Sequence, residues 1–263
     1  MPSWLKEGRG SLCGANVSLL LREMGITKPL LVAGERTKNV FFARTGMRLP
    51  VFDAFHPNPD LQDCVAGAAL YQEKGCDGLI SIGGGSAMDT AKGIKALLMT
   101  DIAHVRANQL PPEGKVPHLA IPGTAGTGAE TTAVAVLYED GQKLSVDHPA
   151  LLPDGVLLDG SLLDTLPEYH RKSCAMDALA QGIESWWAKK ATPGSRIHAE
   201  RAIRGVLDNL TAYLQGDRKA QDEMLHAAYE SGVAILTTRT TAAHAMSYQI
   251  TKKLGAAHGH ACM

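Results

Sequence analysis

The residues of this chain that could hold a metal ion are an aspartate, a glutamine and two histidines. Asp177 and Gln181 are four residues apart, so on a helix their side chains lie on one face and can converge on one ion. His244 would lie on a later helix, and His258 at the turn after Gly255. Oxygen and imidazole ligands without a thiolate suit iron(II), zinc or manganese. The four side chains therefore predict one divalent metal site, provided that the fold brings them together.

Each of these four side chains also has a structural alternative. A single histidine in an apolar helix is more often a hydrogen-bonded core residue than a metal ligand. Asp177 could equally cap a helix or pair with a nearby residue. Gln181 could be a plain buried amide. Its neutral amide oxygen would also make a looser site than a third histidine would. Sequence spacing alone does not decide between these alternatives.

A second group of residues has the parts of a phosphate cradle. An apolar run over 78–82 leads into Gly83-Gly84-Gly85-Ser86 and then into a helical pattern. Glycines let the backbone approach a ligand closely, the helix N-terminus presents free N–H groups, and Ser86 could add a hydroxyl. The spacing matches neither the common GxGxxG fingerprint nor a Walker loop. A tight strand-to-helix turn that needs glycine is the structural alternative.

A second loop, over 123–132, favours the ligand-binding interpretation. It follows another apolar run, at 118–121, and consists of small residues and threonines with the single exception of Glu130. Two such loops at the carboxyl ends of strands in one parallel sheet would face a shared crevice, which is the usual ligand position in such sheets.

The elements that must position these residues differ between the two parts of the chain. Residues 1–166 alternate short apolar runs with helical periodicity, which predicts a parallel sheet with crossover helices. The expected buried strands are 29–34, 78–82 and 118–121. Beyond this part the strand signals fade, and apolar spacings of three and four predict amphipathic helices. The expected helices are 168–188, 195–214 and 218–238, with turns at Pro193-Gly194 and Gly216-Asp217. We therefore expect an α/β domain over 1–166 and an all-helical domain over 167–263.

Composition excludes several classes of partner. The formal net charge of −1 and the interspersed charges provide no basic face for nucleic acid and no polybasic segment for a membrane surface. No apolar run approaches the roughly 20 residues of a membrane span, and the first residues lack a signal-peptide core, so the cytoplasm is the expected compartment. The five cysteines are scattered and form no CxxC pair. They are expected to be reduced thiols rather than disulfides or a zinc site.

Together these segments resemble the iron-containing (group III) alcohol dehydrogenase family, which is related more distantly to glycerol dehydrogenase and dehydroquinate synthase. The run from Gly83 to Lys92 looks like the family's GGGSxxDxAK, and Pro122 to Glu130 is similar to its PTTAGTGSE. Pro57-Asn58-Pro59 resembles an upstream PNP segment. The resemblance implies a dehydroquinate synthase-like architecture, with a nucleotide-binding α/β domain followed by an all-α metal-binding domain. Family members continue through several more helices after the segment at His258, so we expect the helical domain to be incomplete.

The resemblance also implies roles for individual residues. Asp177, His244 and His258 match three metal-binding positions, whereas Gln181 stands where the family has a histidine. Tyr248 stands where many members have a histidine thought to relay protons; its hydroxyl could take that catalytic role, and a packing role is equally open. The residues that match cofactor contacts are Asn58, Gly84, Gly85 and Ser86 towards the diphosphate or adenosine, Thr124, Thr127 and Thr132 towards the nicotinamide, and Lys143.

These roles imply a metal-dependent, NAD(P)-linked oxidoreductase that transfers hydride between the nicotinamide and a small aldehyde or alcohol. Iron(II) is the favoured metal and zinc the second option. The residues around Gln181, His244 and His258 look most like the phosphonoacetaldehyde reductase branch, which converts phosphonoacetaldehyde to 2-hydroxyethylphosphonate. Such a substrate needs a cation nearby, for which Arg239 is a candidate.

The cofactor can be NADPH or NADH. At the end of the first predicted strand, where NAD-preferring relatives often have an aspartate, this chain has Gly34, followed by Glu35 and Arg36. A missing carboxylate leaves room for a 2′-phosphate, which Arg36 could bind, so NADPH is slightly favoured.

Two other functions stay open at this point. One is a truncated, non-catalytic paralogue or fragment that keeps nucleotide binding. The other is a lyase of the dehydroquinate synthase kind, for which more basic residues around the metal would be expected. A homodimer is compatible with any of these functions.

Overall fold

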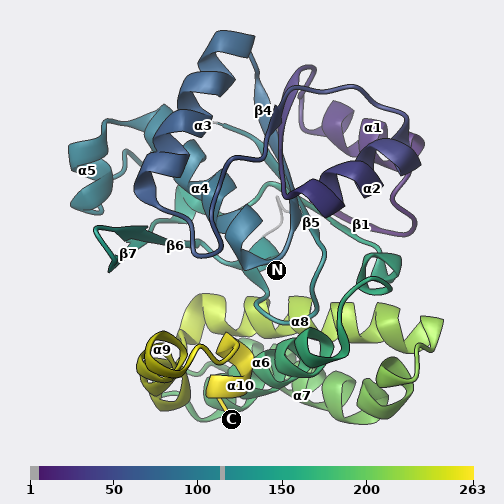
Figure 1. Ribbon diagram of the computed structural model, residues 1–263. Coiled ribbons are helices and arrows are strands. Elements are labelled where there is room, and N and C mark those ends of the chain that lie inside the picture. Colours follow the sequence, from purple (N-terminus) through teal and green to yellow (C-terminus); the bar gives the residue numbers. More distant parts are fainter. Residues whose placement is uncertain (1–5, 113–115) are drawn as a thin grey trace. The chain divides into compact units, whose positions relative to one another are not determined.

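The computed structural model describes residues 6–112 and 116–263, with the backbone alone for residues 6–9, 248 and 252 (Figure 1). The described residues form two compact units. The first contains the residues up to Pro122 together with Ala133–Leu158, and the second contains Gly123–Thr132 and Asp159–Met263.

A six-stranded parallel sheet forms the centre of the first unit, with the strand order β1-β8-β5-β4-β2-β3. The strands are β1 (Lys6–Arg9), β2 (Pro29–Ala33), β3 (Val51–Phe52), β4 (Gly78–Gly83), β5 (His118–Pro122) and β8 (Gly155–Leu158). Every residue of β2, β4 and β5 is buried, as expected for the central strands of a sheet covered on both faces. The three predicted strands and the α/β fold are confirmed.

Helices cover both faces of this sheet (Figure 1). α1 (Gly14–Glu23) and α2 (Glu35–Thr45) lie on one side, and α3 (Leu61–Lys74) and α4 (Gly85–Met99) lie on the other, followed by the short α5 (Ile102–Arg106). Leu30 and Leu79 of the sheet pack with Cys64 of α3 and Ile94 of α4 in one buried cluster.

A β-hairpin that the sequence did not predict follows the loop after β5. Its strands are β6 (Val134–Glu139) and β7 (Gln142–Asp147), and they pair in antiparallel fashion. Asp140 and Gly141 both have positive φ angles, the backbone conformation of the tight turn that matches strand twist.

The second unit is helical. Its helices are α6 (Glu168–Trp187), α7 (Pro193–Leu214), α8 (Arg218–Thr238), α9 (Ala242–Leu254) and α10 (His258–Ala261). Small residues allow close packing: a Cβ on Gly182 of α6 would lie 3.0 Å from Ile203 of α7, and one on Gly205 of α7 would lie 2.8 Å from Ala227 of α8. The predicted helical character of this part is confirmed.

One predicted turn is wrong in detail. Pro193-Gly194 opens α7 instead of preceding it, because Thr192 caps the helix and exchanges hydrogen bonds with Ser195. Proline is well tolerated at the first helical position, where its missing N–H would have no partner within the helix.

Two segments predicted to belong to the α/β domain over 1–166 group instead with the helical unit. In the loop 123–132, Thr131 Oγ1 donates to Tyr229 O on α8, and a Cβ on Gly128 would lie 2.6 Å from Gly232 Cα. The segment after Leu158 is held to α8 by Gly160 N, which donates to Asp222 Oδ1, 3.0 Å away. This division depends on close backbone packing and on polar contacts between residues far apart in the sequence. The local periodicity of the sequence does not predict such contacts.

None of the described helices is long and apolar enough to cross a membrane.

Candidate active site

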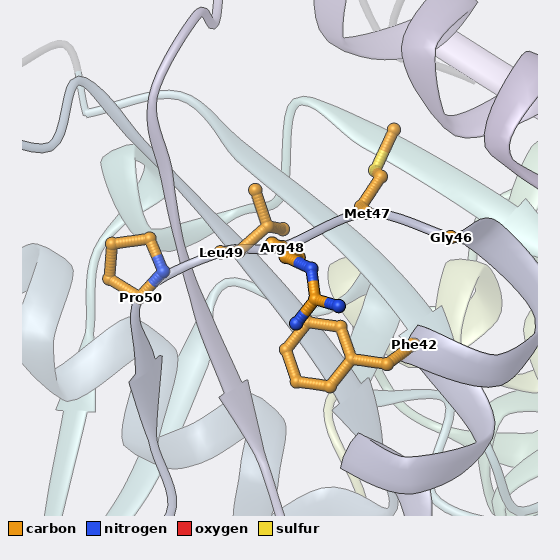
Figure 2. A pocket seen from close by; sticks show the side chains of 6 residues that line it. All are labelled: Phe42, Gly46, Met47, Arg48, Leu49 and Pro50. Carbon is orange, nitrogen blue, oxygen red and sulfur yellow. The ribbon is translucent and has the colours of Figure 1, made fainter.

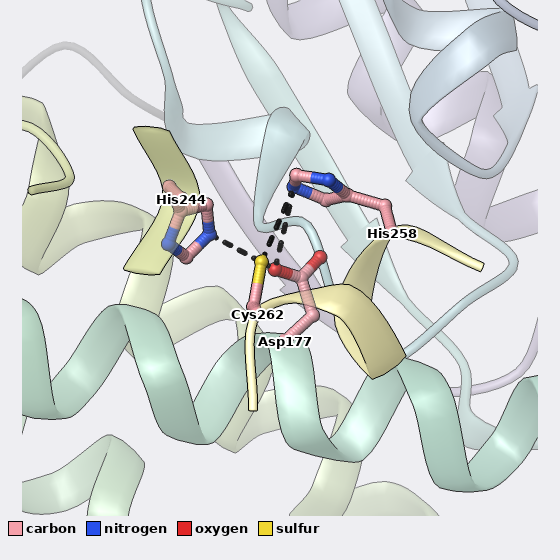
Figure 3. Close-up of side chains that lie close together, drawn as sticks. All are labelled: Asp177, His244, His258 and Cys262. Atoms are coloured by element: carbon pink, nitrogen blue, oxygen red, sulfur yellow. Dashed lines mark hydrogen bonds and ion pairs between the residues drawn. The ribbon is translucent and has the colours of Figure 1, made fainter. Parts of the chain in front are cut away.

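Three of the predicted metal ligands lie together in the second unit (Figure 3). Asp177 lies on α6, His244 on α9, and His258 is the first residue of α10. His244 Nε2 is 3.1 Å from Asp177 Oδ1, and His258 Nε2 is 3.9 Å from the same oxygen. Asp177 and His244 are each 3% exposed. Side chains 67 and 81 positions after Asp177 thus meet it in one buried cluster.

Cys262 joins these three side chains, and sequence reasoning missed it. Its Sγ lies 3.8 Å from His258 Nε2, and one ligand atom from each of the four residues lies within 4.8 Å of all the others. An ion with four ligands at about 2.0–2.3 Å in a tetrahedron separates those ligands by roughly 3.3–3.8 Å. The three pair distances of 3.1, 3.8 and 3.9 Å given above lie close to this range, so the donor set fits a small divalent cation. The sequence signal that could have indicated Cys262 is its spacing from His258, because residues i and i+4 lie on one face of a helix.

Gln181 makes the hydrogen bonds of a buried amide. Its Oε1 accepts from Ser231 Oγ at 2.8 Å, and its Nε2 donates to Thr127 O at 3.2 Å. The same nitrogen lies 3.4 Å from Asp177 Oδ1. The amide nitrogen thus faces the cluster and the carbonyl oxygen faces Ser231. A ligand role for Gln181 stays a prediction.

Glu184 fixes the orientation of His244. Its Oε2 lies 2.5 Å from His244 Nδ1, while its Oε1 accepts from Ala243 N and Thr241 Oγ1. With Nδ1 bound to this carboxylate, Nε2 faces Asp177, which is the usual arrangement of a metal-binding histidine. Glu184 is 1% exposed. After Cys262, Glu184 is the second residue of this cluster that sequence reasoning did not single out.

The electrostatics of this cluster favour a cation. Burial alone lowers the pKa of His244, but its hydrogen bonds to Asp177 and Cys262 outweigh burial and raise the pKa to about 10. For Cys262, burial raises the pKa of the thiol, whereas hydrogen bonds with His244 and His258 lower it, to about 7 overall. A divalent ion bound here would displace these protons, because imidazole and thiol ligands bind metal in their deprotonated forms.

The short helix α10 is held against α6 one turn before Asp177. His260 N donates to Ser173 Oγ at 3.1 Å, and Ala257 N donates to Tyr169 Oη at 3.2 Å. A Cβ on Gly259 would collide with the backbone oxygen of Ser173, so this position requires glycine. These contacts bring His258 and Cys262 to Asp177.

Tyr248 lies on α9, one turn after His244. Its side chain lies outside the described part of the structure, so the proton-relay role stays a prediction.

The segment predicted to form a phosphate cradle lies in the first unit, where β4 ends and α4 begins. Gly83 has a φ of 148°, and a Cβ there would lie 3.1 Å from Ala87. Gly84, the N-cap of α4, makes no side-chain capping bond, and the described first turn holds no acidic residue. Asn58 N donates to Ser86 Oγ at 3.3 Å. The arrangement fits an anionic diphosphate at a helix N-terminus.

The remaining predicted cofactor residues lie in both units. Thr124, Thr127 and Thr132 belong to the second unit, where Thr127 Oγ1 accepts from Ala129 N. Lys143 lies on β7 of the first unit, close enough to Asp89 of α4 for their charges to interact. Burial lowers the pKa of Lys143, and Asp89 opposes that shift. Their cofactor roles stay predictions.

The carboxyl end of β2 is open at the position that bears on cofactor choice. Gly34 is the N-cap of α2, and a Cβ there would meet no atom within 4 Å. The Glu35 carboxylate accepts from Lys38 Nζ at 2.6 Å and from Asn39 Nδ2 at 3.1 Å. Lys38 Nζ also donates to Asp53 Oδ2 at 2.7 Å, so this one lysine is shared between two carboxylates.

A surface pocket of about 560 Å³ lies elsewhere in the first unit, between the end of α2 and β3 (Figure 2). It is lined by Phe42, Gly46, Met47, Arg48, Leu49 and Pro50. None of the predicted site residues is among them.

Comparison with known families identifies the chain. Residues 2–160 match the model for iron-containing alcohol dehydrogenase, and residues 172–263 match the C-terminal model of the Fe-containing alcohol dehydrogenase family. The chain belongs to the iron-containing alcohol dehydrogenase family. The resemblance predicted from the sequence motifs is confirmed.

Individual family members agree with this assignment. The chain is 32% identical over 254 residues to the probable alcohol dehydrogenase EutG of Salmonella typhimurium, covering 93% of this chain and 62% of that protein. It is 35% identical over 223 residues to the phosphonoacetaldehyde reductase of Streptomyces viridochromogenes, covering 79% of this chain and 56% of that protein. The chain thus spans about three fifths of these two relatives.

A solved structure supports the same fold. The NAD⁺ complex of sulfoacetaldehyde reductase from Bifidobacterium kashiwanohense superposes with a TM-score of 0.90 at 29% identity, over 99% of this chain and 72% of that one. The two-part architecture of an α/β part and a helical part is that of the iron-containing alcohol dehydrogenase fold.

Proposed function

We propose that this chain forms the catalytic part of a metal-dependent, NAD(P)-linked oxidoreductase acting on small aldehydes and alcohols. The observation that carries the proposal is the meeting of Asp177, His244 and His258 around one point in a buried cluster. Three residues far apart in the sequence, with donor atoms at ligand-to-ligand distances, are better explained by a shared ion than by three separate core roles.

In this proposal each residue has a stated task. Asp177, His244 and His258 hold the cation, with iron(II) favoured and zinc as the second option, while Glu184 keeps His244 Nε2 turned towards it. A bound divalent cation would act as a Lewis acid on the carbonyl oxygen during hydride transfer from the nicotinamide. Tyr248, one turn after His244, is proposed to move the proton that the product oxygen requires.

The cofactor is proposed to bind its diphosphate at the N-terminus of α4. Asn58, Gly84, Gly85 and Ser86 would contact the diphosphate, and Thr124, Thr127, Thr132 and Lys143 complete the proposed set. The family match and the NAD⁺ complex of the sulfoacetaldehyde reductase support a nicotinamide cofactor. The open position at Gly34 and the neighbouring Arg36 support NADPH as the preferred form.

The substrate is proposed to be a short aldehyde that carries an anionic group, such as phosphonoacetaldehyde. Two of the similar proteins are named for aldehydes of this kind, one with a phosphonate and one with a sulfonate. Arg239 is the proposed anion-binding residue. It follows α8 directly, two positions before Thr241, whose hydroxyl donates to Glu184.

The proposal is tested with the purified full chain under anaerobic conditions. Protein loaded with iron(II) or zinc is mixed with NADPH or NADH and a panel of short aldehydes, and loss of reduced nicotinamide absorbance is followed. We expect oxidation with at least one aldehyde, abolished in Asp177→Asn. Cofactor binding without turnover under every metal would reject the enzyme function, and product formation without net nicotinamide consumption would favour a lyase.

A further inference from the structure

We propose that Cys262 Sγ, and not the amide of Gln181, is the fourth protein ligand of the metal centre. The inference rests on the proposed metal site and goes beyond it, because it replaces the expected oxygen and imidazole set with an aspartate, two histidines and a thiolate. Two observations carry it: the hydrogen bonds of Gln181, and the position of Cys262 in the cluster.

The amide of Gln181 is turned the wrong way to bind a cation. Its Nε2 faces two acceptors, Thr127 O at 3.2 Å and Asp177 Oδ1 at 3.4 Å. Rotating the amide by half a turn would place its oxygen against both of these oxygens and would lose the hydrogen bond to Thr127. The orientation of a glutamine amide is assigned from its hydrogen-bond partners. Here they place the carbonyl oxygen at Ser231.

Cys262, in contrast, already stands among the other donors. The residue is 6% exposed, and its Sγ lies 3.8 Å from His258 Nε2 (Figure 3). His258 and Cys262 are separated by one turn of α10, so both side chains leave that helix on the face that meets Asp177. The bond from Cys262 N to His258 O, at 3.1 Å, continues the helix through the cysteine.

The anchoring of α10 keeps the sulfur in that place. Gly259 lies directly on the α6 backbone at Ser173, and His260 N is bound to Ser173 Oγ. Ser173 and Asp177 are themselves one helical turn apart on α6. The short helix therefore presents both its histidine and its cysteine to the aspartate from a fixed position.

A thiolate ligand has chemical consequences. On binding, the sulfur–metal bond forms as the S–H bond breaks, and the thiol proton leaves to solvent. Sulfur is a soft donor, so the site would favour zinc, cobalt and cadmium over manganese more strongly than a site of oxygen and nitrogen alone. The metal preference of this chain would then differ from that predicted from Asp177, Gln181 and the two histidines.

Cobalt(II) substitution tests the sulfur ligand directly. We expect Co²⁺ bound to the wild-type chain to give visible d–d bands together with an intense near-ultraviolet thiolate-to-cobalt charge-transfer band. Cys262→Ser should lose the charge-transfer band, whereas Gln181→Leu and the control Cys174→Ser should keep it. In competition titrations, Cys262→Ser should raise the Kd for Zn²⁺ by more than about 100-fold, and Gln181→Leu by about tenfold, the lower end of the range for an outer-shell contact.

The outcomes separate this inference from the proposed function. If wild-type protein binds no Co²⁺, the metal site itself is refuted. If d–d bands appear without the charge-transfer band, or if that band survives in Cys262→Ser, the site stands and the sulfur ligand is refuted. Because a variant can fail to fold, circular dichroism accompanies each titration, and the wild-type spectrum alone decides whether a thiolate is bound. A larger loss of affinity for Cd²⁺ than for Mn²⁺ in Cys262→Ser would provide independent support.

Discussion

Arg36 is the single residue that best tests the choice of cofactor, because it lies in the first turn of α2, directly after the open position at Gly34. If it binds the 2′-phosphate, Arg36→Ala removes a charge-assisted interaction of about 1.5–3 kcal/mol. We expect the Kd for NADPH to rise at least about tenfold, with the Kd for NADH almost unchanged, measured by fluorescence titration. Arg22→Ala on α1 is the matched control. Equal losses for both nucleotides would contradict a 2′-phosphate contact.

Arg239 has a positive φ of 64°, which is unusual for a residue with a long side chain and is found at functional positions more often than elsewhere. We expect Arg239→Ala to lower kcat/KM for phosphonoacetaldehyde at least about tenfold, the value of one charge-assisted hydrogen bond. For neutral propionaldehyde the change should be small. The assay compares initial rates for both aldehydes.

A glycine variant separates the charge of Arg239 from its backbone. Glycine adopts positive φ without strain, so Arg239→Gly keeps the local conformation while it removes the guanidinium. The proposed anion contact predicts the same selective loss for Arg239→Gly as for Arg239→Ala. Normal activity of Arg239→Gly on the phosphonate would instead assign a purely structural role to this position.

At the scale of elements, the sequence predicts what depends on local pattern. A local pattern predicts the central strands β2, β4 and β5, because burial on both faces requires a continuous apolar run. A local pattern also predicts the helices α6, α7 and α8, because burial of one helical face requires apolar residues three and four positions apart. The two-residue β3 is too short to show a pattern. In the hairpin, burial alternates along the first part of β6, but the residues there are apolar at both the buried and the half-buried positions, and β7 is mostly exposed or half-buried. β6 therefore shows no clear alternation of apolar and polar residues, and the alternation in β7 is short.

The site was predictable only in part, for a related reason. Asp177, His244 and His258 were found through motifs, but their meeting depends on three helices that sequence spacing does not relate. Cys262 was set aside because scattered cysteines rarely form a metal site, and no motif assigned a role to Glu184. Both acquire a function through the position of α9 and α10 against α6, which is a tertiary property.

The packing of α10 on α6 can be tested at Gly259. A methyl group there would meet the Ser173 backbone and lie 2.8 Å from Asp177 Cβ. Overpacking of this kind costs about 1–3 kcal/mol, and movement of α10 would carry His258 and Cys262 away from Asp177. We expect Gly259→Ala to weaken Zn²⁺ binding at least about tenfold by isothermal titration, since every 1.4 kcal/mol is tenfold.

Gly194→Ala provides the matched control for this substitution. Gly194 is also helical, but a Cβ there would lie 3.8 Å from its nearest neighbour, Thr192 Oγ1, which is an ordinary contact. Zinc affinity should therefore be unchanged in Gly194→Ala. Wild-type affinity in Gly259→Ala would mean that α10 does not position the ligands.

At the scale of the whole molecule, the residues proposed for the chemistry are divided between the two units. The phosphate cradle at α4 belongs to the first unit, and the metal donors on α6, α9 and α10 belong to the second. The two family models divide the chain similarly, at residues 2–160 and 172–263. Each unit must therefore be stable under assay conditions for turnover to be observed.

The stability of the first unit should depend on pH through His118, a fully buried residue at the start of β5. Its Nε2 lies 2.8 Å from Ser81 Oγ on β4, and its Nδ1 has no hydrogen-bond partner among the described residues. Burial, assisted by the positive charges of Lys95 and Lys92, holds the pKa of His118 well below its ordinary value. The folded state therefore keeps this ring neutral at a pH where the unfolded chain binds a proton.

The sign of the effect follows from proton uptake by the unfolded chain. Stability rises with pH wherever the unfolded state binds more protons, so His118 should destabilise the protein as pH falls from about 7 towards the lowered folded-state pKa. Relative to an unfolded-state pKa of about 6.5, the loss at pH 5 is at most about 2 kcal/mol.

Two replacements that cannot titrate, His118→Leu and His118→Gln, differ in packing and in their bond to Ser81 but should both remove this loss. Urea unfolding of each variant, followed by circular dichroism under reducing conditions, should show its stability relative to wild type increasing by up to about 2 kcal/mol between pH 7.5 and pH 5. A difference that stays constant with pH would mean that His118 accepts a proton in the folded protein.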